Sequence, residues 1–150
     1  MKTHILLMLF LGLFAHQATA QKTKVKIKNE IATVDGSDYV QWKRLVGSNA
    51  VSVHEIGSGD EVIFLRWMSY NTSSDNDPST RVNWVEIKFL EQELTCEITS
   101  RGNKGLVKFF VENNLFVNGE LDAEAAALVV KKFGNNFSAN RPESVIIINN

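Results

Sequence analysis

Alternation of apolar and polar residues runs through the first hundred positions of the chain and predicts a series of β-strands. The two longest segments are EVIFLRWMSY at 61–70 and RVNWVEIKFL at 81–90, both rich in β-branched and aromatic residues. The first is apolar on both faces except at Arg66, the pattern of a central strand covered on both sides. The second carries Glu86 and Lys88 on one face, which predicts one buried and one solvated face.

Shorter alternating segments surround this pair and are separated by turn-forming residues such as Asp35-Gly36 and 57–60. Connections this short join antiparallel neighbours, because a parallel crossover needs about a dozen residues or more. Further strands are therefore expected at 22–29, 31–34, 39–45, 50–56 and 93–99. Together these strands predict an antiparallel β-meander.

The period of the apolar residues changes after position 100 and predicts a short helix. Leu106, Phe109 and Phe110 follow helical spacing, and the helix is expected to end near Asn113-Asn114. Strands followed by helices are typical of an α+β domain. The predicted fold is therefore an antiparallel β-meander sheet followed by two C-terminal helices packed on one face.

The second helix has clear boundary signals. Asp122 is a good N-cap residue, Glu124 lies in the first turn, and Gly134 is expected directly after the last turn. The apolar face of this helix is expected to comprise Leu121, Ala125, Leu128, Val129 and Phe133.

The first twenty residues have the composition of a secretory signal. Lys2 precedes an apolar run at 5–14, and Ala18-Thr19-Ala20 supplies the small-x-small pattern before a cleavage site. The run is shorter than the roughly 20 residues that span a bilayer, and Gln21 is not the cysteine of a lipoprotein.

We therefore expect residues 1–20 to be cleaved and a single α+β domain at 21–150 to be exported. Its expected location is periplasmic or extracellular, without a lipid anchor or membrane insertion. Within the domain, 135–150 is expected to be a loosely attached tail, or to add an edge strand through its apolar residues at 144–148.

The chain carries 16 basic and 17 acidic residues, a balance that does not favour nucleic-acid binding, which calls for a basic patch. The local exception is a set of alternate lysines in the first strand. Lysines on an edge strand prevent pairing with other sheets, and a stripe that binds an anionic ligand is the alternative. The set comprises Lys22, Lys24, Lys26 and Lys28.

Cys96 is the only cysteine, which excludes an intrachain disulfide. It alternates with Leu94 and Ile98 and therefore lies on the apolar face of its strand. We expect a buried, unreactive thiol.

Asp75 and Asp77 lie in the polar stretch 71–80, the longest loop expected in the domain. Calcium binds six to eight oxygen ligands, and alternate acidic residues in a loop can supply several. However, the loop lacks the glycine and the distal Glu of an EF-hand. Calcium at Asp75 and Asp77 is therefore kept as a hypothesis, and no other cofactor is indicated.

Aromatic residues of the strands form a second candidate site, of the kind that stacks on glycans or peptides. Trp84 falls on the strand face that carries Glu86 and Lys88 and is expected to be partly exposed, and Tyr70 adjoins the long loop. Packing within the sheet is the alternative for both residues, because cross-strand aromatic pairs stabilise sheets.

No common catalytic motif is present. His54 faces the polar side of its strand, and Glu55 points to the opposite face because adjacent strand residues alternate. A catalytic histidine needs a partner that orients it, and here that partner would come from another strand, such as Arg66 or Glu86.

These observations favour an exported, non-catalytic binding or protein-interaction module over an enzyme. Its ligand is expected to be a protein or a glycan, bound around Trp84, Tyr70, Arg66 and His54. One alternative is a small hydrolase-like enzyme that uses His54 with carboxylates. The other is an inhibitor or assembly partner that adds a strand to another protein, through 144–148 or the lysine-rich first strand.

Overall fold

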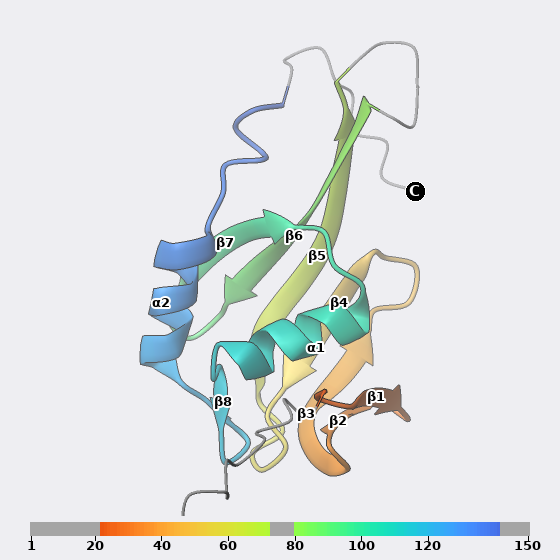
Figure 1. Cartoon of the computed structure of the whole chain (residues 1–150), viewed down its shortest axis with the longest axis vertical. Helices are drawn as coiled ribbons and strands as arrows, with labels where there is room; N and C mark the ends of the chain where they lie inside the picture. Colours follow the sequence, from red (N-terminus) through yellow and green to blue (C-terminus); the bar gives the residue numbers. More distant parts are fainter. Residues whose placement is uncertain (1–21, 73–79, 142–150) are drawn as a thin grey trace, which may run out of the picture.

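A seven-stranded antiparallel sheet organises the structure (Figure 1). The computed structural model of the chain describes residues 22–72 and 80–141. Each strand pairs with the next one along the chain, which confirms the predicted β-meander. The strands are β1 (Val25–Lys28), β2 (Ile31–Val34), β3 (Ser37–Arg44), β4 (Ala50–His54), β5 (Glu61–Asn71), β6 (Arg81–Phe89) and β7 (Leu94–Thr99).

Two helices follow the sheet, α1 (Asn103–Glu112) and α2 (Ala123–Phe133). A small hairpin of β8 (Phe116–Val117) and β9 (Glu120–Leu121) separates them, which the sequence did not predict because each strand has only two residues. α1 contacts β1, and α2 lies along β7 (Figure 1). The predicted α+β class is confirmed.

Both helix boundaries follow the predicted signals. The Asp122 carboxylate accepts a hydrogen bond of 2.8 Å from the backbone N–H of Ala125, as expected of an N-cap. α1 ends at Glu112 with Asn113 as its C-cap, and Asn114 then takes a left-handed conformation with φ of 52°. Asparagine tolerates this conformation better than most residues, so the chain can turn toward β8.

The core lies between the helices and one face of the sheet. The indole of Trp42 packs on Phe110 of α1 with ring centroids 6.2 Å apart, and Phe109 contacts Phe133 of α2 at 5.2 Å. Burying one large apolar side chain stabilises a fold by about 1.5–3 kcal/mol. The largest side chains in this core are Trp42, Phe89, Phe109, Phe110, Ile63, Leu65 and Ile87, all at most 2% exposed.

β5 is central in the sheet, but its middle is covered on one face only. Ile63 and Leu65 are fully buried on the helix side, whereas Phe64 and Met68 are partly exposed and Arg66 is exposed. The prediction that both faces of this strand are covered is therefore wrong for its middle. We call the helix-free face of the sheet the open face.

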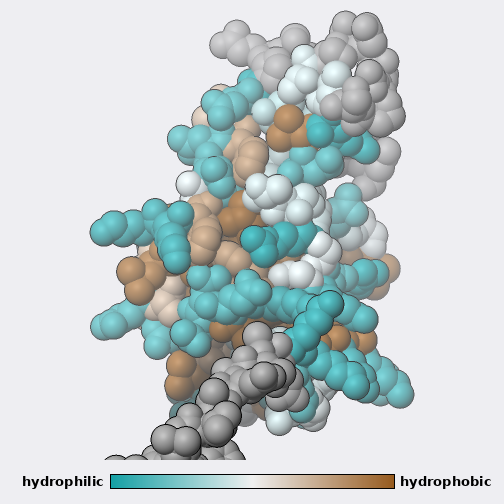
Figure 2. Space-filling model, viewed as in Figure 1, coloured by the Kyte–Doolittle hydropathy of each residue, from teal (hydrophilic) through white to brown (hydrophobic). Residues whose placement is uncertain are grey.

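The outer surface seen from the α1 side is mainly hydrophilic, with hydrophobic residues in separate patches (Figure 2). Leu128 is one exposed hydrophobic residue, with 63% of its surface accessible. Its predicted place on the buried face of α2 is wrong. α2 instead turns the small Ala126 and Val129 toward the core, where both are at most 2% exposed.

Replacement of Gly134 by Ala is expected to lower the free energy of unfolding by about 1–3 kcal/mol. Gly134 has an ordinary φ of −60°, but a Cβ there would lie 2.6 Å from the carbonyl oxygen of Val130. Urea unfolding measures the change. Gly57→Ala is the control, because a Cβ at Gly57 meets nothing within 4 Å. Equal stability of G134A and G57A would contradict the close approach.

Alkaline pH is expected to destabilise the fold through two core groups. Burial raises the pKa of the Cys96 thiol from 9.0 to about 11, helped by the nearby charge of Glu97. Burial likewise raises the pKa of Tyr39 from 10.0 to about 12. Both groups hold their protons more tightly when folded, so their contribution to stability is complete below about pH 9 and is lost as the pH rises toward 12.

Thermal unfolding midpoints between pH 7 and pH 11 measure this effect. The Tyr39→Phe variant should lose part of the decline above pH 9, since it cannot ionise. The same decline in the variant and the parent chain would show that Tyr39 does not contribute. The predicted burial of Cys96 itself is confirmed, because the residue is 3% exposed.

Candidate functional site

Strand register brings a row of side chains together across the middle of the open face. Lys43 pairs with Ser52, Ser52 with Phe64, and Phe64 with Lys88. Adjacent strands lie about 4.8 Å apart, so the row crosses four strands in roughly 14 Å. In this row the partly exposed Phe64 lies between Ser52 and Lys88, and Lys43 lies one strand beyond Ser52.

A second row beside the first carries Arg66, which the sequence predicted as a site residue. Its side chain is 45% exposed, and its guanidinium donates to the Glu86 carboxylate at 2.9 Å. The same carboxylate oxygen lies 3.7 Å from the ammonium of Lys88. The Glu86 carboxylate thus forms salt bridges with two cations, Arg66 and Lys88. Lys43 has no salt bridge within the described part of the chain.

His54 also lies on the open face, but both of its ring nitrogens are engaged. Nδ1 lies 2.9 Å from the carbonyl oxygen of Gly59, and Nε2 lies 2.9 Å from the hydroxyl of Ser52. A carbonyl only accepts, so Nδ1 carries the proton in this network and the Ser52 hydroxyl donates to Nε2. These two hydrogen bonds connect the turn after β4 to the strand.

A serine, a histidine and an acceptor behind the histidine are also the elements of an activated nucleophile. Ser52, however, is only 5% exposed. None of the hydrogen bonds described for His54 involves a carboxylate. The carboxylate that lies opposite His54 in strand register, that of Glu61, is not hydrogen-bonded to the ring within the described residues.

Trp84 is 2% exposed, so the prediction that it is partly exposed is wrong. Alternation does place it on the open face, but other aromatic rings cover it there. The ring of Tyr70, itself 7% exposed, meets it edge-on with centroids 5.5 Å apart. The ring of Phe137 stacks on it at 6.1 Å with an interplanar angle of 21°. Trp84 and Tyr70 thus pack against other aromatic rings in this structure.

The cover over Trp84 comes from the strap, as we call residues 135–141 after α2. The backbone N–H of Asn135 donates to the Glu97 carbonyl, and that of Ser138 to the Glu97 carboxylate, both at 2.9 Å. The Tyr70 hydroxyl donates to the carbonyl of Asn140 at 3.4 Å. Residues 135–141 are thus attached to the sheet by hydrogen bonds, while the edge strand expected at 144–148 lies outside the described residues.

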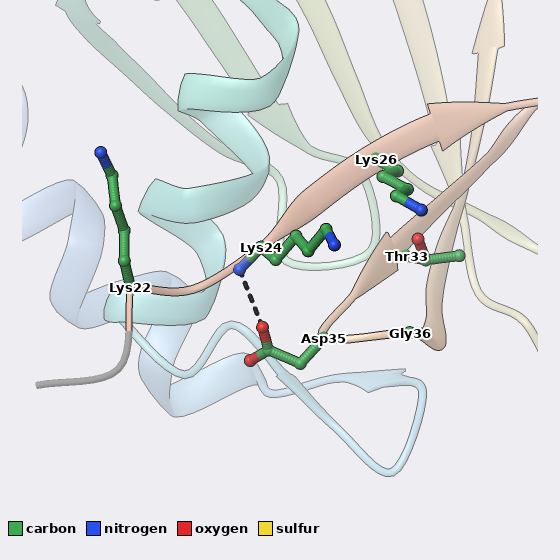
Figure 3. Close-up of a pocket in the computed structure, with 6 residues that line it drawn as sticks. All are labelled: Lys22, Lys24, Lys26, Thr33, Asp35 and Gly36. Atoms are coloured by element: carbon green, nitrogen blue, oxygen red, sulfur yellow. Dashed lines mark hydrogen bonds between the residues drawn. The ribbon is translucent and has the colours of Figure 1, made fainter. Parts of the chain in front are cut away.

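The lysines of the first strand lie on an edge of the sheet, as predicted. Lys22, Lys24 and Lys26 line an open hollow of about 420 Å³ together with Thr33 and the turn at Asp35 (Figure 3). The Asp35 carboxylate accepts from the backbone N–H of Lys24 at 2.8 Å. Lys22 points away from Thr33 and the turn (Figure 3), so the ammonium groups do not converge on one point.

The calcium hypothesis is untested, because Asp75 and Asp77 lie outside the described residues. Within 22–72 and 80–141, no group of three or more His, Cys, Asp or Glu side chains is placed to hold a metal ion. No helix in this part of the chain is long and apolar enough to cross a membrane.

Phe137→Ala is expected to expose Trp84 and to lower the free energy of unfolding by about 1–3 kcal/mol, since a half-buried ring is lost. Acrylamide quenching of tryptophan fluorescence should increase as water reaches the indole. Asn136→Ala is the matched control, because its exposed side chain adjoins Phe137 without covering Trp84. Unchanged quenching in F137A would show that the strap does not shield Trp84.

Comparison with models of protein families, with curated proteins and with solved structures finds no match to this chain.

Proposed function

We propose that the chain is a non-catalytic binding module that holds its ligand across the open face of the sheet. The row of Lys43, Ser52, Phe64 and Lys88 is the observation that carries the proposal. Its aromatic ring and two ammonium groups are arranged on rigid strands, and helices cover only the opposite face. Arg66 and His54, expected at the site from the sequence, flank this row.

The charges of the open face favour an anionic ligand. Lys28 pairs with Ile31, and Ile31 with Gln41, so the lysines of β1 continue the face that carries Lys43. Among the acidic residues of this face, Glu86 is shared by Arg66 and Lys88, and Glu97, its register partner on β7, accepts from the backbone N–H of Ser138. A surplus of cations on one face raises the local concentration of anions and speeds their association. The expected ligand is an anionic segment of a protein or an anionic glycan.

The strand layout favours binding over catalysis. Catalytic groups work in clefts that exclude water and hold the substrate near a base. His54, the histidine of the described residues, has both nitrogens engaged by its own strand and turn. The open face instead offers an extended surface of the kind that lies along a polymer.

Thermal unfolding with two polyanions tests this proposal: polygalacturonate for a glycan and poly-L-glutamate for a protein segment, with neutral dextran as the control polymer. A ligand that binds only the folded state stabilises it by about 2.7 kcal/mol at one hundred times its Kd. We expect one polyanion to raise the unfolding temperature and dextran to leave it unchanged. The effect should weaken in high salt, because exposed charges are screened.

Charge-reversal variants locate the site. The double variant Lys43→Glu, Lys88→Glu should abolish the stabilisation by the polyanion. The double variant Lys131→Glu, Lys132→Glu makes the same change of charge on α2, away from the open face, and should retain it. Equal loss in both double variants, or no stabilisation of the parent chain by either polyanion, would reject the open face as an anion-binding surface.

A further inference from the structure

The turn between β3 and β4 exposes two adjacent aliphatic residues. The Leu45 side chain is 41% exposed and Val46 is fully exposed, with a relative accessibility of 102%. The turn projects sideways from the body of the molecule beyond the ends of its two strands (Figure 1). Val46 is the most exposed of the large hydrophobic residues in the described part of the chain.

Hydrogen bonds within the turn hold these side chains outward. The hydroxyl and the backbone N–H of Ser48 both donate to the Leu45 carbonyl, at 3.0 and 3.2 Å, and the Leu45 N–H donates to the Ala50 carbonyl. Gly47 takes a left-handed φ of 77° that closes the turn. Because these backbone groups are already paired, they would lose little on leaving water.

Trp67 fixes the turn to the body of the protein. Its backbone N–H donates to the Asn49 carbonyl, and its indole N–H donates to the Arg101 carbonyl, both at 2.9 Å. A hollow of about 520 Å³ separates the turn from the start of α1 and is lined by Arg44, Trp67 and Asn103, among others. The hydrogen bonds of Trp67 therefore hold the turn that carries Leu45 and Val46 against the rest of the protein.

The segments around the turn carry basic residues and no acidic residue. The segments 43–50 and 100–108 contain no Asp or Glu, and the first turn of α1 has no acidic residue. Exposed apolar residues flanked by cations are typical of protein segments that bind the interface of anionic membranes. The basic residues of these two segments are Lys43, Arg44, Arg101, Lys104 and Lys108.

We propose that the β3–β4 turn docks the protein onto an anionic lipid surface. Leu45 and Val46 enter the interface between headgroups and acyl chains, and the surrounding lysines and arginines bind the headgroups. A lipid surface fits better than a protein partner, because a stable protein interface buries about 800 Å² on each side, more than a projecting turn supplies. This contact is peripheral and adjoins the open face, with which it shares Lys43.

Vesicle co-sedimentation tests the proposal with the chain from residue 21, which omits the apolar run at 5–14 that would itself bind lipid. The probes are vesicles of phosphatidylglycerol with phosphatidylcholine, and vesicles of phosphatidylcholine alone. We expect binding to the anionic vesicles only, with loss at high salt because the attraction is screened. No binding, or equal binding to both vesicles, overturns the proposal and leaves the turn to a protein partner.

Val46→Asp is the decisive variant, because the fully exposed side chain makes no contribution to the core that its loss could remove. Its affinity for anionic vesicles should fall about tenfold or more, as expected when one buried aliphatic side chain is replaced by an anion. Leu128→Asp is the matched control: it places the same charge on another exposed aliphatic residue, on α2. Equal losses in V46D and L128D, or none in V46D, would overturn the role of the turn.

Discussion

Burial of one sheet face beneath two short helices is the constraint on which the other surfaces of this protein depend. α1 and α2 have 10 and 11 residues, and both lie on the same face of the seven-stranded sheet. The middle of the open face has no helix over it and is in contact with water. This explains why Phe64 is only partly covered although its strand is apolar on both sides. Polar residues at alternate positions make that exposure tolerable.

Trp84 shows how the fold covers a large ring on a face that has no helix. Its indole N–H has no hydrogen-bond partner within the described residues, a loss of about 1–3 kcal/mol. Burial of a tryptophan removes roughly 150–250 Å² from water, which at about 25 cal/mol per Å² contributes some 4–6 kcal/mol. Burial therefore outweighs the unpaired N–H, and the strap is favoured over an exposed ring. The aromatic residues of this end of the sheet serve stability.

Periodicity predicted the features that depend on neighbours in the sequence. Strand order, the Asp122 cap and the end of α1 at Asn113-Asn114 all follow from local patterns. It could not predict the cover of Trp84, because Phe137 lies far along the chain in a polar stretch. It was wrong at Leu128 for a similar reason: the rotation of α2 is decided by the close packing of Ala126, and the helix pattern allows either face.

For the candidate site, too, the sequence predicted what depends on a single strand and not what depends on turns or on register between strands. Alternation placed His54 correctly on the polar side of its strand, but the expected two-sided cover of β5 gave no reason to find Arg66 exposed and paired with Glu86. The partners of His54 were not predictable, because the Gly59 carbonyl reaches its Nδ1 only through a turn in which Gly59 has φ of 76°. The row from Lys43 to Lys88 depends on register across three strand pairs, which no pattern within one strand determines.

The charged groups of the open face are unequally paired with one another. On a face that is only solvated, cations and anions on neighbouring strands gain by pairing one to one. Here Glu86 is shared by Arg66 and Lys88, and the Asp35 carboxylate is bonded to the backbone of Lys24. The ammonium groups of Lys43 and of β1 have no salt bridge within the described residues. An anionic ligand would supply the missing partners, and its charge would reduce the repulsion between these cations.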